Sequence, residues 1–574
     1  MYEDIIEKIQ IERWEEARLL LLQVSQTDDI SCILNATVDF HFGEWESMFK
    51  WLEKGIRCNP DNAELYLLLG NYYEEKNVNQ AYLCYEMALS LCKEQKDYDT
   101  IMAYLNNLSE SFRVDVKPYS YIIISYNSLK KTKDCIESIR KNDIEGTYEI
   151  IVVDNASSDG SREWLLEYKN ESDIKIMCNE ENRGFPIACN QGIKMAEPEN
   201  DIFLLNNDAI VTPKSVFWLR MGLYSDENVG VTGSVSNCAG NHQAVFIEEH
   251  TMEKFEEYAF SNNVLMESPY EMKVYLIGFA MMIKRKALDE VGLLDTRFTP
   301  GTFEDVDYGV RMNQASWKVM LCKNSFIIHM SKDNENTWYK VYGINKNKFK
   351  EKWGMDVSYY SHAREDIIEL IQREKNEKFN VLEVGCGMGA TLSRISSEWK
   401  YATVKGIEIS DEVARIGQNI TDITIGNIEE MKIDYPQGEF DYIILADVLE
   451  HIHNPIAVLE KLKGYLKQDG CFLFSIPNIA HFSVIWPLIN GRFDYQNEGL
   501  LDRTHVHFFT LESIKGIIQE LNMDIKFLAY LKSNDSDKPE NLEIVNRLTE
   551  LTGSPEDKYN FMAYQYILKV GNRK

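Results

Sequence analysis

The chain has 574 residues, of which 44% are hydrophobic, and it carries a net charge of −30. This length exceeds one ordinary hydrophobic core, so we expect about three domains. The negative charge disfavours non-specific nucleic-acid binding and docking on anionic membranes, because both depend on cationic side chains.

The first residues, MYEDIIEKIQ, contain neither a cationic nor an apolar stretch, so we expect no secretory signal. No apolar run approaches the roughly 20 residues that cross a bilayer, so we expect no transmembrane segment. The 11 cysteines are isolated and form no C-x-x-C pair, which is typical of a reducing compartment. These features predict a cytoplasmic protein.

Residues 1–112 show helical apolar spacing, and their sequence contains a repeat. The segment NPDNAELYLLLGNYYEEKNVNQAYLCYEMALSLC, which begins at Asn59, resembles a tetratricopeptide unit. The turns at Gly43 and Asn77 are about 34 residues apart, as in that repeat. We interpret this region as a short solenoid that recognises a partner protein or an acceptor peptide. The alternative is a helical cap that shields another domain.

From Pro118 onward, buried strands alternate with helices. YIIIS precedes a helix expected over 132–141, and three further strands are expected in EIIVVD, DIKIM and DIFLLNN. Such alternation predicts a parallel sheet, which binds ligands at the carboxyl ends of its strands. Polar residues follow three of these strands: Ser125, Tyr126 and Asn127, then Asp154 and Asn155, then Asn206, Asn207 and Asp208.

Five segments in this order, SYN, VVDNASSDGS, NRGFPIACNQG, LLNNDAIV and FEDVDYGVRM, resemble a family 2 glycosyltransferase with a GT-A fold. The resemblance covers 117–345 and implies a nucleotide-diphosphate sugar as donor. It implies that Asp154 reads the donor base and that Asp208 holds Mn²⁺ or Mg²⁺ on the diphosphate. The donor site implied by the resemblance consists of Ser125, Tyr126, Asn127, Asp154, Arg183, Asn207 and Asp208.

The segment GTFEDVDYGVR resembles the part of the family that carries the catalytic base. By position Asp305 is the base of an inverting transfer, and Glu304 flanks it and orients the acceptor or the metal. For Asp307 the alternatives are a similar role or capping of the following helix. His329 matches a family position that binds the metal or the diphosphate, the alternative being a structural histidine. Gly278 and Phe279 are expected on the acceptor side.

A second strand–glycine turn–helix unit begins at VLEVGCGMGA. KGIEIS follows and ends a second strand at Glu408, an acid suited to a ribose hydroxyl pair. With EFDYIILADVLEHIHNP, this pattern resembles a class I S-adenosylmethionine-dependent methyltransferase with a Rossmann-like fold. The resemblance implies a cofactor site composed of Glu383, Gly385, Gly387, Gly389, Glu408, Asn427, Ile428 and Asp447.

Methyl transfer is a direct displacement in which the protein mainly aligns the two substrates, although an O- or N-methyltransferase can add a base. The candidates for that base are His451, His453, His505 and His507. The two H-x-H pairs also suggest a metal, but no third ligand at suitable spacing is evident. Asp502 and His505 either face the acceptor or form a local hydrogen-bond staple.

We therefore expect a helical repeat domain at 1–112, a GT-A domain at 117–345, a helical connector at 346–377 and a methyltransferase domain at 378–572. The leading hypothesis is an enzyme that glycosylates a hydroxyl of a glycan or protein acceptor, such as surface polysaccharide or flagellin, and methylates the same or a related acceptor. The alternative hypothesis is a tetratricopeptide scaffold of a glycan-assembly complex in which only one enzymatic core is active.

Overall fold

The computed structural model describes residues 2–25, 28–168, 171, 173–330 and 335–573. The chain forms two compact units, Met1–Asp356 and Val357–Lys574. The first unit contains a helical region followed by an α/β region, and the second unit is a further α/β region. Within the part of the chain that is described, no helix is long and apolar enough to cross a bilayer.

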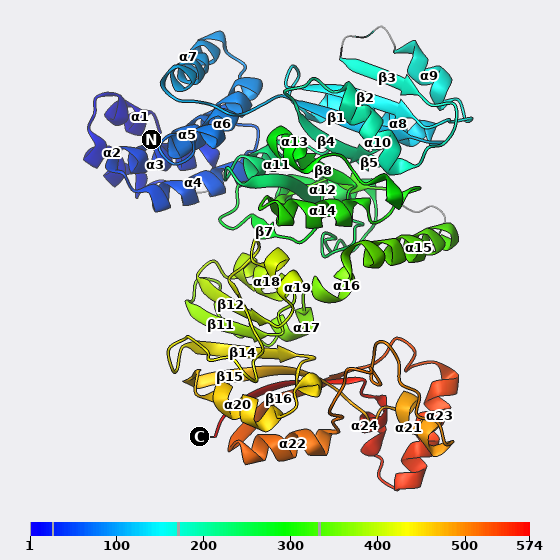
Figure 1. Ribbon diagram of the computed structural model, residues 1–574. Coiled ribbons are helices and arrows are strands. Elements are labelled where there is room, and N and C mark those ends of the chain that lie inside the picture. The colour runs from blue at the N-terminus through cyan, green and yellow to red at the C-terminus, as the bar shows by residue number, and fades with distance from the viewer. Residues whose placement is uncertain (1, 26–27, 169–170, 172, 331–334, 574) are drawn as a thin grey trace. The chain divides into compact units, whose positions relative to one another are not determined.

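The N-terminal region is helical, and its consecutive helices pack as pairs (Figure 1). Gly70 and Tyr85 show why two of them approach closely: a Cβ atom on Gly70 would lie 2.1 Å from a carbon of the Tyr85 ring. A side chain at position 70 would therefore push the two helices apart. The helices are α1 (Tyr2–Gln10), α2 (Trp14–Leu21), α3 (Asp29–Phe42), α4 (Trp45–Cys58), α5 (Ala63–Glu74), α6 (Val78–Leu91) and α7 (Gln95–Ser111).

Helix α6 packs on helix α11 (Ser215–Leu223) of the following α/β region. The Gln80 amide donates to the Met221 carbonyl over 2.9 Å, and Arg220 forms an ion pair with Glu86. Apolar side chains of both helices belong to one continuous core. Helix α6 therefore covers the α/β region, as the cap alternative expects, and recognition of a partner by the other helices stays a prediction.

The first α/β region contains a sheet in the order β3-β2-β1-β4-β8-β6-β9-β7, in which β3, β2, β1 and β4 are parallel. Strand β8 runs antiparallel to both of its neighbours, β4 and β6. A separate pair joins β5 to β10. The strands are β1 (Tyr119–Ser125), β2 (Tyr148–Asp154), β3 (Ile174–Cys178), β4 (Asp201–Asn206), β5 (Ala209–Ile210), β6 (Val229–Val235), β7 (Tyr270–Met272), β8 (Ala280–Ile283), β9 (Lys318–Phe326) and β10 (Ile328–His329).

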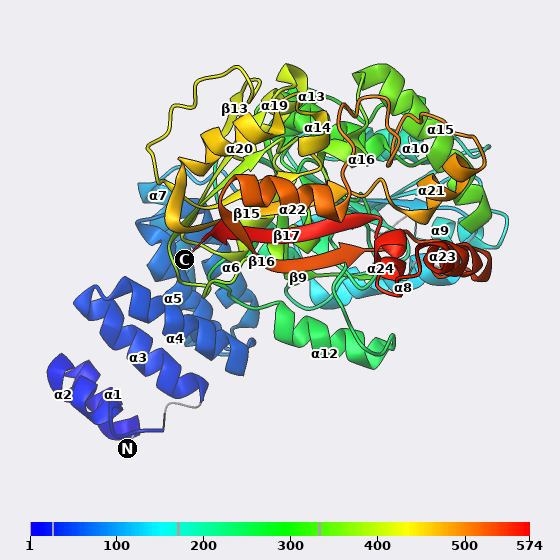
Figure 2. The same cartoon turned by 90° about the horizontal axis from the view of Figure 1, so that it is seen from below.

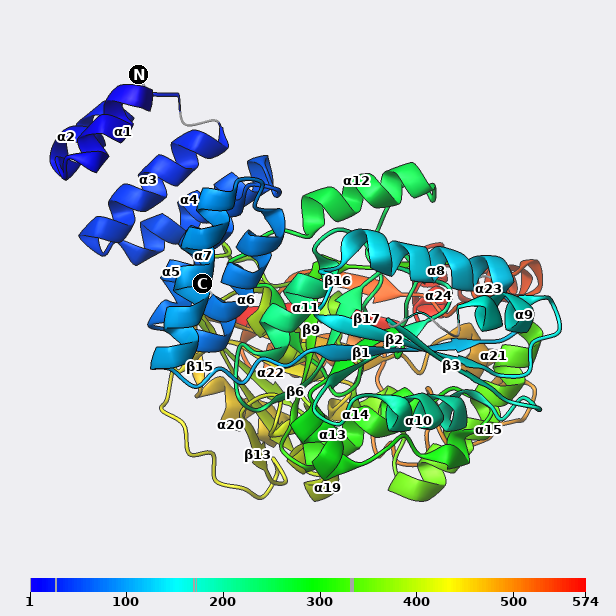
Figure 3. The same ribbon diagram turned by 90° about the horizontal axis from the view of Figure 1, so that it is seen from above.

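Helices cover both faces of this sheet (Figure 3). Alternate residues of β1 point to opposite faces: Tyr121 and Ile123 pack with α8, and Ile122 and Ile124 pack with α10. Burial on both faces explains the continuous apolar run of the strand. The helical segments are α8 (Leu129–Asn142), α9 (Ser161–Glu167), α10 (Phe185–Met195), α12 (Met252–Asn262), α13 (Arg285–Val291), η1 (Thr296–Phe298), α14 (Glu304–Gln314) and α15 (Glu335–Trp353).

The second unit contains a sheet in the order β13-β12-β11-β14-β15-β17-β16. The strands from β13 to β15 are parallel, and β17 is antiparallel to β15 and β16. The strands are β11 (Phe379–Val384), β12 (Ala402–Glu408), β13 (Ile423–Ile425), β14 (Phe440–Ala446), β15 (Leu466–Pro477), β16 (Met523–Leu531) and β17 (Gln565–Asn572).

Helices α20 and α22 lie on one face of this second sheet (Figure 2), and α18 and α19 pack with other strand residues in a separate core. The predicted connector, 346–377, contains the end of α15 and two short helices, α16 and α17. The helical segments of this unit are α16 (Val357–Tyr360), α17 (Glu365–Ile368), α18 (Ala390–Glu398), α19 (Asp411–Gly417), η2 (Leu449–His451), α20 (Pro455–Lys463), α21 (Phe482–Ile489), α22 (Leu511–Glu520), α23 (Pro539–Thr552) and α24 (Asp557–Met562).

Candidate active sites

The ends of β1 and β2 bring Ser125 and Asp154 together, since these two residues are paired in register. Asp154 is fully buried, and its Oδ2 accepts a hydrogen bond of 3.2 Å from the backbone N–H of Ser157. Its Oδ1 is also buried and has no hydrogen-bond partner among the described residues. Because an unpaired buried acceptor is costly, this oxygen is a ready acceptor for donor groups of a ligand.

Two loops beside Asp154 hold other residues of the predicted donor site. Asn127 accepts a 2.8 Å hydrogen bond from the backbone N–H of Ser158, and the preceding Tyr126 is half-exposed. The backbone N–H of Arg183 donates to the Asn155 side chain over 3.0 Å, and the Arg183 side chain is half-exposed. The side-chain amide of Asn207 donates to the hydroxyl of Thr132.

Asp208 and His329 form a pair at the end of β4. The distance from Asp208 Oδ1 to His329 Nε2 is 3.3 Å, and Lys131 lies 3.7 Å from the other oxygen of Asp208. Burial would raise the pKa of Asp208, but the hydrogen bond with His329 and the charge of Lys131 bring it below its usual value. His329 Nδ1 lies 2.8 Å from the carbonyl oxygen of Cys238, which can only accept, so the proton sits on Nδ1. Nε2 is then the ring atom that faces Asp208, and it would offer its lone pair to a cation that replaced this hydrogen bond.

Glu304 and Asp305 begin helix α14 as two adjacent acids. Asp305 accepts hydrogen bonds from the backbone N–H groups of Gly278 (2.9 Å) and Val306 (2.8 Å). Burial raises the pKa of Asp305, and these two N–H groups oppose that rise. Burial and the charge of Asp305 raise the pKa of Glu304 well above its usual value, and Glu304 Oε2 has no partner within the described ranges. The proton of the pair therefore belongs on Glu304, which leaves Asp305 as the carboxylate.

Asp305 and Asp208 lie along one short chain of contacts. Gly278, which donates to Asp305, is followed by Phe279, whose ring stacks on His329 with 5.0 Å between ring centroids. The carbonyl of Phe279 also accepts from the backbone N–H of Asn206 over 2.8 Å. The segment 278–279 thus joins the predicted base to the predicted metal pair.

Asp307 and Asn345 have roles that sequence reasoning missed. Asp307 is fully buried and, contrary to both roles considered for it, forms an ion pair with Arg311 and binds Lys352 and Trp353 of α15. The amide of Asn345, also in α15, donates to the carbonyls of Phe298, Gly301 and Thr302 over 2.7–3.1 Å. Helix α15 therefore holds the loop that leads into Glu304 and Asp305.

In the second unit, the glycine-rich turn after β11 is tightly enclosed. Gly385, Gly387 and Gly389 all have positive φ angles, a region that favours glycine. A Cβ on Gly387 would lie 2.6 Å from the Tyr360 carbonyl oxygen, and one on Gly385 would lie 2.6 Å from Val448. The backbone N–H of Gly387 donates to Glu408 Oε2 over 2.9 Å, so the ends of β11 and β12 are joined.

Glu383 and Glu408 provide two buried carboxyl groups at this edge of the sheet. Glu408 Oε1 accepts from the backbone N–H of Ser410 over 2.9 Å, and each of its oxygens keeps a further lone pair for a ligand hydroxyl. Burial raises the pKa of Glu383 to about 8, and its Oε2 has no partner in the described chain. Glu383 is therefore largely protonated near neutral pH.

Asn427 is held by a local contact, whereas Asp447 binds side chains from distant parts of the chain. Asn427 accepts from the backbone N–H of Glu429 over 3.0 Å, and Ile428 is buried. Asp447 follows β14 and binds three donors that sequence reasoning did not identify: Arg364, Ser475 (3.1 Å) and Gln565 (2.8 Å).

The four candidate histidines separate into two groups. The rings of His451 and His505 lie 4.8 Å apart, next to Glu450. His507 Nε2 lies 3.0 Å from the carbonyl oxygen of His453, and the exposed His453 pairs with Glu429. Asp502 accepts from the backbone N–H and the hydroxyl of Thr504, which is the staple alternative proposed for it.

Comparison with known families agrees with this division of the chain. Residues 120–292 match the family described as glycosyl transferase family 2, and residues 359–526 match a family described as methyltransferase domain. The chain contains a family 2 glycosyltransferase domain followed by a methyltransferase domain. This confirms the predicted fold class, with a helical N-terminal region, a GT-A domain and a Rossmann-like methyltransferase domain. The two families imply a nucleotide-sugar donor and S-adenosylmethionine.

Three curated relatives are similar to parts of the chain. YfnE of Bacillus subtilis (strain 168), an uncharacterized glycosyltransferase, is 22% identical over 252 residues, which cover 37% of this chain and 64% of that protein. A poly-beta-1,6-N-acetyl-D-glucosamine synthase of Staphylococcus epidermidis is 27% identical over 192 residues, which cover 33% and 45%. A ubiquinone biosynthesis O-methyltransferase of Actinobacillus pleuropneumoniae serotype 7 (strain AP76) is 32% identical over 123 residues, which cover 19% and 52%. The chain thus spans about half to two thirds of the length of these relatives.

Proposed function

We propose that the chain catalyses two group transfers. The glycosyltransferase domain moves a sugar from a nucleotide-diphosphate donor to a hydroxyl of a glycan or protein acceptor, with inversion at the anomeric carbon. The methyltransferase domain moves a methyl group from S-adenosylmethionine to the same or a related acceptor. Similarity to a polysaccharide synthase supports a surface glycan, and the helical N-terminal region supports a protein acceptor such as flagellin.

The observation that carries the first activity is the contact chain from Asp305 through Gly278 and Phe279 to His329 and Asp208. This chain of contacts supports a site in which Asp305 serves as the base and Asp208 holds a cation. In the proposed step, the acceptor hydroxyl gives its proton to Asp305 and its oxygen bonds to the anomeric carbon. The bond from that carbon to the donor diphosphate breaks, and its electron pair leaves with the diphosphate.

The Asp208–His329 pair fits a divalent cation. Two cis ligands of an ion with bonds of about 2.1 Å lie about 3.0 Å apart, close to the 3.3 Å between Asp208 Oδ1 and His329 Nε2. The Cys238 carbonyl fixes the ring so that its lone pair faces this position. When bound, such an ion neutralises charge on the leaving diphosphate. Two protein ligands suffice when the donor's phosphate oxygens supply the others.

The second activity is supported by the enclosed glycine turn together with the two carboxyl groups, Glu383 and Glu408. The glycines allow the positive φ angles and the close contacts with Tyr360 and Val448 that hold the turn beside Glu408, where its backbone can face a cofactor. Glu408 has the lone pairs to accept two ribose hydroxyl protons. S-Adenosylmethionine supplies an electrophilic methyl group, and the protein holds the acceptor atom in line with it.

The first activity is tested on the full chain with a panel of nucleoside diphosphates, with and without Mn²⁺, in a thermal-shift assay. We expect one nucleotide to raise the melting temperature, and Asp154→Ala to remove that shift. Asp305→Asn should keep the shift but lower sugar-nucleotide turnover by about 10²–10⁴-fold. Unchanged turnover in both Asp305→Asn and Asp208→Ala would defeat the proposal.

The second activity is tested by isothermal titration of the full chain with S-adenosylmethionine. We expect one binding site, and a clear loss of affinity in Glu408→Ala, which removes both carboxylate oxygens. Glu412→Ala is the matched control, because Glu412 lies on the exposed side of α19, four residues further along the chain. Absence of binding, or equal binding in Glu408→Ala, contradicts the assignment.

A further inference from the structure

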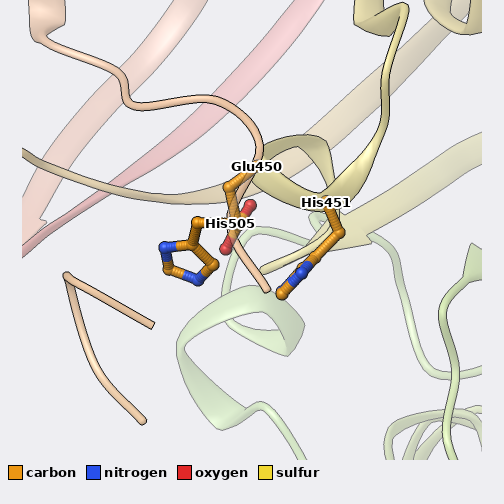
Figure 4. Close-up of side chains that lie close together, drawn as sticks. All are labelled: Glu450, His451 and His505. Atoms are coloured by element: carbon orange, nitrogen blue, oxygen red, sulfur yellow. The ribbon is translucent and has the colours of Figure 1, made fainter. Parts of the chain in front are cut away.

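Glu450, His451 and His505 lie close together in the methyltransferase domain (Figure 4). In that view the Glu450 carboxylate lies between the two imidazole rings. Each residue offers one ligand atom, and these atoms all lie within 4.8 Å of one another. A tetrahedral ion with bonds of about 2.0–2.1 Å needs ligand atoms about 3.3 Å apart, so side-chain movements of about 1 Å would close the cluster on an ion.

Two of the three residues have polar atoms that the protein leaves unsatisfied. Glu450 Oε2 and His505 Nδ1 are buried and have no hydrogen-bond partner among the residues that the structure describes. Each such unpaired atom destabilises the fold relative to a paired one. A cation would remove both penalties at once.

Surrounding hydrogen bonds fix the orientation of the third residue. His451 Nδ1 lies 3.3 Å from both the carbonyl oxygen and the hydroxyl oxygen of Thr504. The Thr504 hydroxyl donates its own proton to Asp502 over 2.6 Å, and a carbonyl can only accept. His451 Nδ1 must therefore carry the proton, which leaves the lone pair on Nε2, as in histidines that bind metals.

The backbone holds the two segments of the cluster together. The carbonyl oxygen of Glu450 accepts from the N–H groups of Val506 (2.8 Å) and His507 (3.1 Å). These bonds keep η2 beside the segment that carries His505. The cluster is thus built on two fixed backbone segments.

We propose that Glu450, His451 and His505 bind one divalent transition-metal ion of the Zn²⁺ class. Two imidazole nitrogens and one carboxylate favour such an ion over Mg²⁺ or Ca²⁺, which prefer oxygen ligands. Three protein ligands leave a position open for water or a substrate oxygen. Asp447 is not part of the set, because Arg364, Ser475 and Gln565 already occupy its carboxylate.

The position of the cluster gives the ion a role that rests on the proposed methyltransferase function. Val448, two residues before Glu450, contacts the position that a Cβ of Gly385 would occupy in the predicted cofactor turn. A hydroxyl on the ion loses its proton to solvent more readily, because the cation stabilises the alkoxide. That oxygen then bonds to the methyl carbon, and the carbon–sulfur bond breaks with its electron pair remaining on sulfur. The site therefore points to O-methylation of a hydroxyl acceptor.

The test uses Co²⁺ as a spectroscopic probe on the full chain, after chelator treatment and dialysis. All proteins carry Asp208→Ala, so that the pair in the glycosyltransferase domain does not contribute. We expect one equivalent of Co²⁺ with visible bands of nitrogen and oxygen ligation and no thiolate charge-transfer band. His505→Ala and Glu450→Gln should each weaken Co²⁺ binding by more than about 10–100-fold. That is the loss typically caused by removing a residue that only hydrogen-bonds to a metal ligand. His451→Ala, at a half-buried position, serves if the variant at the buried Glu450 does not fold.

His453→Ala is the matched control, because His453 is an exposed histidine two residues away that lies outside the cluster. It should bind Co²⁺ as the parent does. S-Adenosylmethionine titrations run in parallel on every variant and should give unchanged affinity in His505→Ala. If the parent binds S-adenosylmethionine but no Co²⁺, or if all variants bind Co²⁺ equally, the metal site is refuted while the methyltransferase assignment stands. If S-adenosylmethionine binds to none of them, the proposed function itself fails.

Discussion

Replacing Glu383 with glutamine removes a titratable group from the end of β11 and keeps the size and shape of the side chain. Burial raises the pKa of Glu383 from 4.5 to about 8, so the folded protein binds this proton more tightly than the unfolded chain. Below pH 4.5 both states are protonated and the group has no effect on stability. Between pH 4.5 and about 8 only the unfolded chain loses the proton, so the folded state loses stability as pH rises.

The magnitude follows from the width of that window. Each pKa unit corresponds to 1.36 kcal/mol or so, which gives about 3 kcal/mol between roughly pH 5 and pH 7.5. In a unit of this size, 1 kcal/mol shifts the melting temperature by about 2–4 °C, so the effect is roughly 6–12 °C. Glutamine does not titrate, and the other ionisable groups are common to both proteins. The gap in melting temperature between variant and wild type should therefore grow in favour of the variant as pH rises.

Differential scanning calorimetry of the full chain measures this gap. The transition of the second unit is the one that S-adenosylmethionine shifts upward. Glu412→Gln, at an exposed position on α19, serves as the control and should keep a constant gap with wild type. A constant gap for Glu383→Gln between pH 5 and pH 7.5 would mean that Glu383 is already ionised in the folded protein, and the reasoning from its burial would be wrong.

Three further predictions concern residues that shape the two sites. Asn345→Ala removes the amide that holds three loop carbonyls, so the free energy of unfolding measured with denaturant should fall by about 1–3 kcal/mol. Sugar transfer should also fall, while nucleotide affinity stays unchanged. A fall in affinity alone would contradict a positioning role. Asp208→Asn should abolish the Mn²⁺ dependence of nucleotide binding in thermal-shift assays, and retained dependence would exclude Asp208 as a ligand. Gly387→Ala places a Cβ 2.6 Å from a backbone oxygen, at a residue whose φ angle is +55°. Titration should therefore show a loss of S-adenosylmethionine affinity of at least about tenfold. Unchanged affinity would show that the turn can relax.

The strand ends of the glycosyltransferase domain were predictable because they follow from a local pattern. A buried run followed by polar residues predicts both the strand and the point where it ends. Parallel strands then bring such points to one edge, as the register of Ser125 with Asp154 shows. The same logic joins Glu383 to Glu408 through the glycine turn between them. The fold therefore follows from the apolar runs and from the polar and glycine residues that end them.

Contacts that depend on distant segments could not be derived in this way. Asp307 binds Lys352 and Trp353, which lie in another helix, and no spacing rule connects them. The local sequence suggested either a role beside Asp305 or capping of the following helix, and neither involves a distant segment. The burial of Asp307 is set by where α15 packs, which is a tertiary outcome. The same holds for Asn345, whose neighbours in sequence give no sign of the loop it binds.

The two H-x-H motifs identify the segments that contain the histidine cluster, but they do not predict which side chains lie next to each histidine. In H-x-H the two side chains are two residues apart, and whether they share a face depends on local backbone geometry. Here η2 ends at His451, so the chain turns before His453 and the two side chains separate, one toward Glu450 and one toward Glu429. Glu450 itself escaped notice because an acid next to a histidine is common in sequence. Only the backbone bonds from Val506 and His507 to Glu450 bring His505 to that acid, so the proposed metal site depends on a long-range pairing and not on either motif alone.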